Sequence, residues 1–121
     1  LAADRGVAIV ASYTLAGGIL TGKYDGDPGA GRAAGTLGQA QWAPAVAAGR
    51  DLAALARDIG ADPASLAMAF ALLDPSVTTV LVGATRPEQV SANPGALALA
   101  ERLTPDERDR LAAVGVGSGR A

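Results

Sequence analysis

Two short runs of hydrophobic residues along the chain predict β-strands. The first covers residues 7–11, and the second covers residues 78–82, which are rich in β-branched side chains. Hydrophobic runs of this length without polar alternation are typical of parallel strands that are buried on both faces. A helix is the alternative for the first run, but Gly6 before it and Gly17 and Gly18 after it leave little room for one.

Between these two runs, apolar residues recur at helical spacing. One helix is predicted from Asp51 as its N-cap to Gly60 at the C′ position. A second helix is predicted to begin at Asp62 and Pro63 and to end before Pro75. The predicted apolar faces consist of Leu52, Leu55, Ala56 and Ile59 in the first helix, and of Leu66, Ala69, Phe70 and Leu73 in the second.

Two capping signals predict the remaining helices. Thr85 and Glu88 have the spacing of a capping box, with Pro87 early in the helix. Residues 104–107 repeat this pattern for a last helix that ends at Gly115. We therefore expect residues 1–115 to form one partial domain and residues 116–121 to form a flexible tail.

The segment from residue 16 to about residue 49 shows no sustained periodicity, because glycines interrupt it repeatedly. A loop of this length inside a compact domain is usually functional or mobile, and the sequence alone supports either reading. Trp42 is predicted to anchor this loop by packing; the alternative is a wall of a substrate pocket.

The order of the predicted elements indicates an α/β fold. A helical crossover between two strands implies that the strands run parallel. Two parallel strands do not make a stable sheet, because parallel sheets are buried on both faces and need further neighbours. The pattern therefore predicts part of an α/β barrel or wound sheet, which is incomplete as a single domain. We expect its open strand edges to promote oligomerisation.

Composition narrows the classes of function. The chain has 10 Lys and Arg residues against 12 Asp and Glu residues, and its pI of about 4.9 predicts no nucleic-acid partner. Cysteine and histidine are absent, which removes thiolate chemistry, the commonest general base and the commonest zinc ligand, so no metal site is expected. The chain shows no signal-peptide pattern and no long uncharged stretch, which predicts a cytoplasmic protein without a membrane partner.

Candidate binding residues follow both predicted strands, where α/β folds place their ligands. Residues 15–18 follow the first strand, and residues 83–86 follow the second and open a helix, whose N-terminus attracts phosphate. Arg86 adds a cation that suits phosphate oxygens, and the spacing places Gln89 and Asn93 on the same helix face. This pattern indicates a polar pocket for phosphate; the alternative is an ordinary capped and solvated helix start.

Two stretches of the sequence resemble signature stretches of the aldo-keto reductase family. They are Leu-Ala-Gly-Gly-Ile-Leu-Thr-Gly-Lys-Tyr at residues 15–24 and Gly-Ala-Thr-Arg-Pro-Glu-Gln-Val-Ser-Ala-Asn at residues 83–93. The helical segment around residues 62–70 resembles the family's penultimate barrel helix, and the match runs from about residue 6 to residue 114. The resemblance implies the C-terminal part of a (β/α)8 TIM barrel, with strands 7 and 8 present. A complete barrel takes roughly 250 residues, so the first six strands are missing.

The family transfers a hydride between NADPH and a carbonyl or alcohol, so the resemblance implies that this chain binds NADP(H). In the branch that includes the potassium-channel β subunits, one group of matching positions lines the pyrophosphate and loop side of the cofactor. In this sequence these positions are Leu15, Gly17, Lys23 and Arg32. A second group holds the adenosine and its 2′-phosphate, and Arg86 is a further candidate for that phosphate. The second group is Gly83, Thr85, Gln89 and Asn93.

The chain also departs from the family pattern. The aromatic residue that stacks on the nicotinamide would fall at Ser12, which cannot stack, and strand alternation predicts that Tyr13 points to the other face. The family's catalytic Asp, Tyr, Lys and His all lie upstream of this segment, and neither Tyr13 nor Tyr24 matches the proton donor. The resemblance therefore implies no catalytic residue in this chain, and we expect no measurable carbonyl reduction by it alone.

Three interpretations remain open on the sequence. The chain is the nucleotide-binding C-terminal part of an NADPH-dependent aldo-keto reductase, whose small carbonyl substrate binds only with the missing part of the barrel. Alternatively, it is a non-catalytic module that pairs with another subunit or copy through its open barrel edge. In the third interpretation it is a remnant that neither folds alone nor binds.

Overall fold

The computed structural model describes residues 2–24, residue 35 and residues 37–114. Arg32 and the predicted tail at residues 116–121 lie outside the described residues. The described elements are, in chain order, η1 (Ala3–Arg5), β1 (Ile9–Ala11), η2 (Ala16–Thr21), η3 (Ala40–Trp42), α1 (Ala43–Asp58), α2 (Pro63–Leu72), β2 (Val77–Val80), α3 (Pro87–Ala92), α4 (Gly95–Arg102) and α5 (Pro105–Ala113), where η denotes a short 3-10 helix.

The two strands pair in parallel, as the crossover predicted. Val10 lies opposite Thr79 and Ala11 opposite Val80, and the Leu81 N–H extends the pairing by donating to the Ala11 carbonyl at 2.8 Å. Both strands are shorter than the hydrophobic runs that predicted them. The fold is therefore a partial α/β domain in which α1 and α2 form the crossover.

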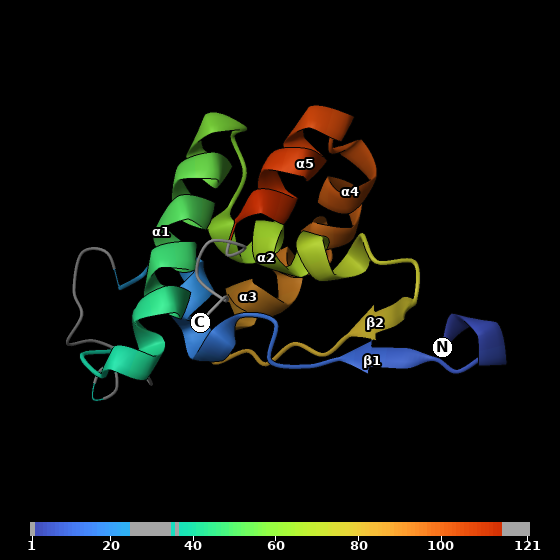
Figure 1. Cartoon of the computed structure of the whole chain (residues 1–121), viewed down its shortest axis with the longest axis horizontal. Helices are drawn as coiled ribbons and strands as arrows, with labels where there is room; N and C mark the ends of the chain where they lie inside the picture. The colour runs from blue at the N-terminus through green and yellow to red at the C-terminus, as the bar shows by residue number, and fades with distance from the viewer. Residues whose placement is uncertain (1, 25–34, 36, 115–121) are drawn as a thin grey trace.

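Helices cover one face of this small sheet, and the other face is open (Figure 1). Val7, Val10 and Leu81 are each more than half exposed, with exposed fractions of 56%, 52% and 59%. The prediction that both strands are buried on both faces is therefore wrong for this chain. The hydrophobic runs have the composition of doubly buried strands, but the described part of the chain contains no second layer to cover the open face.

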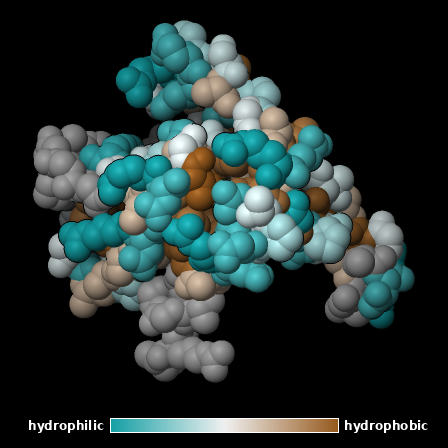
Figure 2. Space-filling model, turned by 90° about the horizontal axis from the view of Figure 1, so that it is seen from above, coloured by the Kyte–Doolittle hydropathy of each residue, from teal (hydrophilic) through white to brown (hydrophobic). Residues whose placement is uncertain are grey.

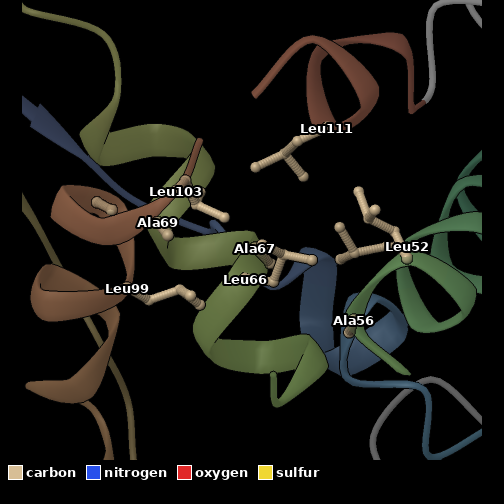
Figure 3. Packing of buried hydrophobic residues seen from close by; sticks show 10 residues of the cluster. Leu52, Ala56, Leu66, Ala67, Ala69, Leu99, Leu103 and Leu111 are labelled. Atoms are coloured by element: carbon tan, nitrogen blue, oxygen red, sulfur yellow. The ribbon is translucent and has the colours of Figure 1, made fainter. Parts of the chain in front are cut away.

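The hydrophobic core lies among the helices rather than against the sheet. Helix α2 occupies its centre, with α1 on one side, α4 on the other, and α5 packed against both α1 and α2 (Figure 3). Small side chains from α2 interlock with leucines from its neighbours, as expected for a chain with only 3% aromatic residues. The buried residues of this core are Leu52, Leu55, Ala56, Leu66, Ala67, Ala69, Leu99, Ala100, Leu103 and Leu111. From the outer side of the helices, the surface is mostly hydrophilic, with a hydrophobic strip showing between them (Figure 2).

The structure corrects the predicted start of the first long helix. Helix α1 begins at Ala43, with Pro44 in its first turn, so Asp51 lies inside the helix and does not cap it. Its first turns pack on Ile19 and Tyr24, and Trp42 packs against the same pair. Two parts of the predicted loop are therefore ordered, namely η2 and the start of α1. The sequence did not predict them, because tertiary packing stabilises both and neither shows local periodicity.

The other predicted helix ends have mixed outcomes. The Asp62 carboxylate accepts a 2.8 Å hydrogen bond from the Ser65 N–H, which confirms it as the N-cap of α2, and Gly60 follows α1 with φ +66°. Phe70, predicted on the apolar face of α2, is half exposed. The helix predicted after Pro87 is two helices, α3 and α4, because Pro94 interrupts the segment.

The capping box at the start of α5 is confirmed and gives a pH-dependent prediction. The Thr104 N–H donates to the Glu107 carboxylate at 2.8 Å, and the Glu107 N–H donates to the Thr104 hydroxyl at 3.3 Å. The backbone hydrogen bond from Thr104 lowers the pKa of Glu107 below its ordinary value of 4.5. A depressed carboxylate pKa stabilises the folded state above the ordinary value, and this stabilisation is lost as pH falls through the folded pKa.

We therefore expect acidification below about pH 4.5 to weaken the wild-type chain more than the Glu107→Gln variant, whose amide oxygen still accepts the bond but does not titrate. Chemical unfolding followed by circular dichroism at several pH values measures the difference. Asp106→Asn is a control, because Asp106 lies in the same helical turn but does not form the box. Parallel pH profiles for wild type and Glu107→Gln would contradict the prediction.

Among the residues that the structure describes, none of the helices combines the length and hydrophobicity that a membrane-spanning segment needs.

Candidate functional site

A hollow of about 530 Å³ lies where the chain leaves the carboxyl ends of the two strands. One side is built by the segment after β1 and the other by the segment after β2. The carboxyl ends of neighbouring parallel strands meet at one edge of a sheet, so residues 70 positions apart in the sequence come together here. The lining residues are Tyr13, Thr14, Leu15, Gly17, Gly18, Thr21, Lys23, Leu81, Val82, Gly83, Ala84, Thr85 and Gln89.

Two consecutive glycines line the hollow. Gly17 and Gly18 have φ values of +68° and +95°, a region that L-residues with side chains rarely adopt. A Cβ at Gly17 would lie 3.0 Å from the Tyr13 hydroxyl oxygen, and a Cβ at Gly18 would lie 2.8 Å from the Lys23 Nζ. Backbone conformation therefore favours glycine at both positions, and a side chain at Gly18 would displace the flexible end of Lys23.

Lys23 brings a positive charge to the hollow. It is the one charged residue among the described residues that line it. Its Nζ lies 4.9 Å from the centre of the Tyr24 ring, within the range of a cation–π interaction, and Tyr24 itself is buried. Thr21 stabilises the turn before Lys23, because its hydroxyl donates to the Gly18 carbonyl at 2.7 Å. The Lys23 cation thus lies against the buried Tyr24 ring and next to the glycine backbone at Gly17 and Gly18.

Gln89 organises the opposite side of the hollow. Its Oε1 accepts hydrogen bonds from the Thr85 N–H at 2.8 Å and the Arg86 N–H at 3.2 Å, and the Thr85 hydroxyl lies 3.3 Å from the same oxygen. The predicted capping box of Thr85 and Glu88 is therefore wrong. The cap residue is Arg86, one position later, so its third following residue is Gln89. The Gln89 side chain therefore satisfies the two amides that immediately precede α3, and the charge at the site comes from Lys23.

The structure brings six of the nine predicted cofactor-binding residues into this one hollow, namely Leu15, Gly17, Lys23, Gly83, Thr85 and Gln89. Asn93 lies instead in a neighbouring depression that is also lined by Leu72, Val80 and Val90. Arg86 is exposed and does not line the hollow. Of these three residues only Gln89 lines the hollow, so Arg86, Gln89 and Asn93 do not form the single polar pocket that their spacing predicted.

Tyr13 lines the hollow, contrary to the prediction from strand alternation. The strand ends at Ala11, and Tyr13 has a left-handed backbone conformation with φ +60°. Alternation of side chains applies only within a strand, so the turn at Tyr13 redirects its side chain. Thr21 is a second lining residue that the sequence interpretation missed, although its position next to Gly22 and Lys23 was a usable signal.

The chemistry of the hollow suits binding. A cation, exposed glycine backbone, a threonine hydroxyl and a carboxamide can hold an anionic ligand with a sugar or amide group. The cradle that Cβ atoms would fill, with Lys23 beside it, fits a phosphate group of a dinucleotide. Across residues 2–24, 35 and 37–114, no cluster of three metal-ligating side chains occurs.

The fold and the hollow define a partial α/β protein whose candidate site lies at the carboxyl ends of parallel strands. Comparison with known proteins identifies its family: a model of the aldo/keto reductase family matches residues 1–115, and the chain belongs to that family. Family membership implies that its two strands and their helices are part of a TIM barrel. A protein of Schizosaccharomyces pombe that carries the name "Putative voltage-gated potassium channel subunit beta" is 38% identical over 100 residues. The match covers 76% of this chain and 29% of that protein, so the chain spans less than a third of its relative.

Proposed function

We propose that this chain is the NADP(H)-binding C-terminal part of an aldo/keto reductase, with β1 and β2 as barrel strands 7 and 8. One observation carries the proposal: two sequence stretches that resemble the family's cofactor-binding stretches line one hollow that holds a lysine and a glycine cradle. NADPH supplies the hydride when it is bound. The residues of this chain bind and orient it.

Each side of the hollow has its own part in this proposal. Lys23 and the backbone at Gly17 hold the pyrophosphate, because a cation beside glycine backbone suits phosphate oxygens. The Gly18 N–H already donates to the Leu15 carbonyl at 2.8 Å, so Gly18 contributes space rather than a donor. Thr85 and Gln89 hold the adenosine side. Two predicted residues, Arg86 and Asn93, lie outside the hollow, and Arg32 lies outside the described residues. These three contribute only if the cofactor extends beyond the hollow.

Catalysis is assigned to residues outside this chain. No residue that lines the hollow matches the catalytic positions of the family, and substrate binding is expected to need the rest of the barrel. A second candidate function is a non-catalytic nucleotide-binding or subunit-interaction module. The open face of the sheet favours it, because an uncovered hydrophobic face packs readily against another chain.

Replacing Lys23 by Met tests the proposal. We expect NADPH to bind the 121-residue chain about 10- to 100-fold more weakly in Lys23→Met, because charged hydrogen bonds contribute about 1.5–3 kcal/mol. Isothermal titration calorimetry with NADPH and with NADH measures both affinities.

Arg57→Met is the matched control, since it removes the same charge from an exposed position on α1 that does not line the hollow. Equal affinity of wild type and Lys23→Met for NADPH would show that the hollow is not the phosphate site. Absence of NADPH binding by the wild-type chain would favour the module that needs another subunit to complete its site.

A further inference from the structure

The small sheet has two edges at which a further strand can pair. It consists of two strands, so β1 and β2 each keep one edge without a strand neighbour among the described residues. Residues 7–11 and 77–82 contain no charged residue and no proline, the residues that commonly block pairing at an exposed edge. Both edges can therefore accept another parallel strand.

A largely apolar groove lies beside the β2 edge. It is the depression that Asn93 lines, and its volume is about 560 Å³. Residues of β2, α2, α3 and α4 line it and no described residue of β1 does, which places it on the side of β2 that faces away from β1. Its lining includes the buried residues Met68 and Ala96 and the more exposed Val82 and Val90. The groove is thus an uncovered hydrophobic surface next to a free strand edge.

The flank beside β1 carries an exposed aromatic side chain instead. Phe70 is 50% exposed on α2 and lies near Thr14 and Leu20, which follow β1 in the chain. Phe70 is two residues from Met68, and side chains two positions apart on a helix do not share a face. The flank beside β1 therefore presents a hydrophobic knob, Phe70, and the flank beside β2 presents the groove.

We propose that copies of this chain associate head to tail, with the β1 edge and the knob of one copy seated on the β2 edge and the groove of the next. A second copy suits these surfaces because one chain carries both of the complementary flanks. Since β1 and β2 are parallel, pairing β2 with the β1 of the next copy continues the sheet without reversing a strand. The two surfaces in contact differ, so the interface is heterologous and gives a closed ring only where the rotation between copies closes.

The barrel geometry of the family sets the number of copies in the ring. Its strands belong to an eight-stranded barrel, in which strand tilt and curvature close the sheet at eight strands. The described part of each copy supplies two strands, so four copies complete the circle. Val10 and Leu81, which are exposed on the open face of a single copy, then face the interior of the ring. The association does not require nucleotide binding, so failure of either proposal leaves the other intact.

A charge placed on each flank tests the ring. Phe70→Glu removes the knob and leaves the groove, whereas Val90→Glu places a charge in the groove and leaves the knob. Both positions are exposed on helices, and circular dichroism checks that each variant is folded. Ala112→Glu is the matched control, because it adds the same charge at an exposed position of α5 that lines neither surface. Light scattering after size-exclusion chromatography measures the mass of the 121-residue chain and of each variant.

We expect wild type and Ala112→Glu to have four times the chain mass of 11.9 kDa, and Phe70→Glu and Val90→Glu alone to have the mass of one chain. An equimolar mixture of these two flank variants should form a dimer, because one intact knob and one intact groove remain between them.

A monomeric or dimeric wild type, or a mass that keeps growing with concentration, overturns the ring, and this measurement decides the matter even if a variant fails to fold. Folded flank variants that stay tetrameric, or a mixture of them that stays monomeric, overturn the head-to-tail contact. Loss of the tetramer in Ala112→Glu as well would show that added charge alone disperses the copies, which also overturns it.

Discussion

Leu66→Ala is expected to destabilise the chain by about 2–5 kcal/mol, the cost of removing a large aliphatic side chain from a packed core. Leu66 is fully buried in α2, the helix that contacts α1, α4, α5 and β2. Truncation removes a fully buried side chain from the core and leaves a cavity that rigid neighbouring helices fill only in part. Total stabilities of small domains are about 5–15 kcal/mol, so this single change takes a large share.

Urea unfolding followed by circular dichroism measures this loss, with Leu97→Ala as the matched control. Leu97 is also a helical leucine, but it is 57% exposed, so its truncation should cost well under half as much. Similar losses for Leu66→Ala and Leu97→Ala would show that α2 is not the centre of the core.

Gly49→Leu is expected to destabilise the chain by about 1–3 kcal/mol, although leucine is a better helix former than glycine by about 0.8 kcal/mol. Gly49 is buried in α1, and a Cβ there would lie 2.9 Å from the backbone carbonyl oxygen of Ile19. That oxygen belongs to η2, so it cannot move aside without moving the turn. Steric overlap with backbone therefore outweighs the gain in helix propensity.

The same substitution should affect the ligand site. Helix η2 carries Gly17 and Gly18, so displacing η2 from α1 should also weaken NADPH binding. Ala47→Leu is the control, because Ala47 is exposed on the same helix and accepts a larger side chain. A Gly49→Leu chain as stable as Ala47→Leu would show that η2 does not pack tightly on α1.

Local signals predicted much of this structure. The capping residues Asp62 and Thr104 form the predicted hydrogen bonds, because such caps depend only on residues three positions apart. The parallel pairing followed from a helical crossover between two hydrophobic runs. In contrast, α1 starts eight residues before the predicted Asp51, since its first turns are held by Ile19 and Tyr24 far away in the sequence.

The candidate site shows the same division. Leu15, Gly17, Lys23, Gly83, Thr85 and Gln89 were named from the sequence and share one hollow. The position of Tyr13 was not predictable, because it depends on a left-handed turn just after the strand, which no local pattern at Ser12 or Thr14 indicates. The shift of the capping box from Thr85 and Glu88 to Arg86 and Gln89 likewise depended on where the helix begins.

By itself, the sequence determined that this is a partial α/β unit. Its hydrophobic runs, helix caps and two glycine-rich stretches are local features, which can be recognised without knowing the tertiary contacts. Only the tertiary structure decided which residues face the shared hollow and that one face of the sheet stays uncovered. These properties depend on backbone turns and on contacts between segments that are distant in the sequence. The free energies of such contacts cannot be estimated from any short stretch of sequence.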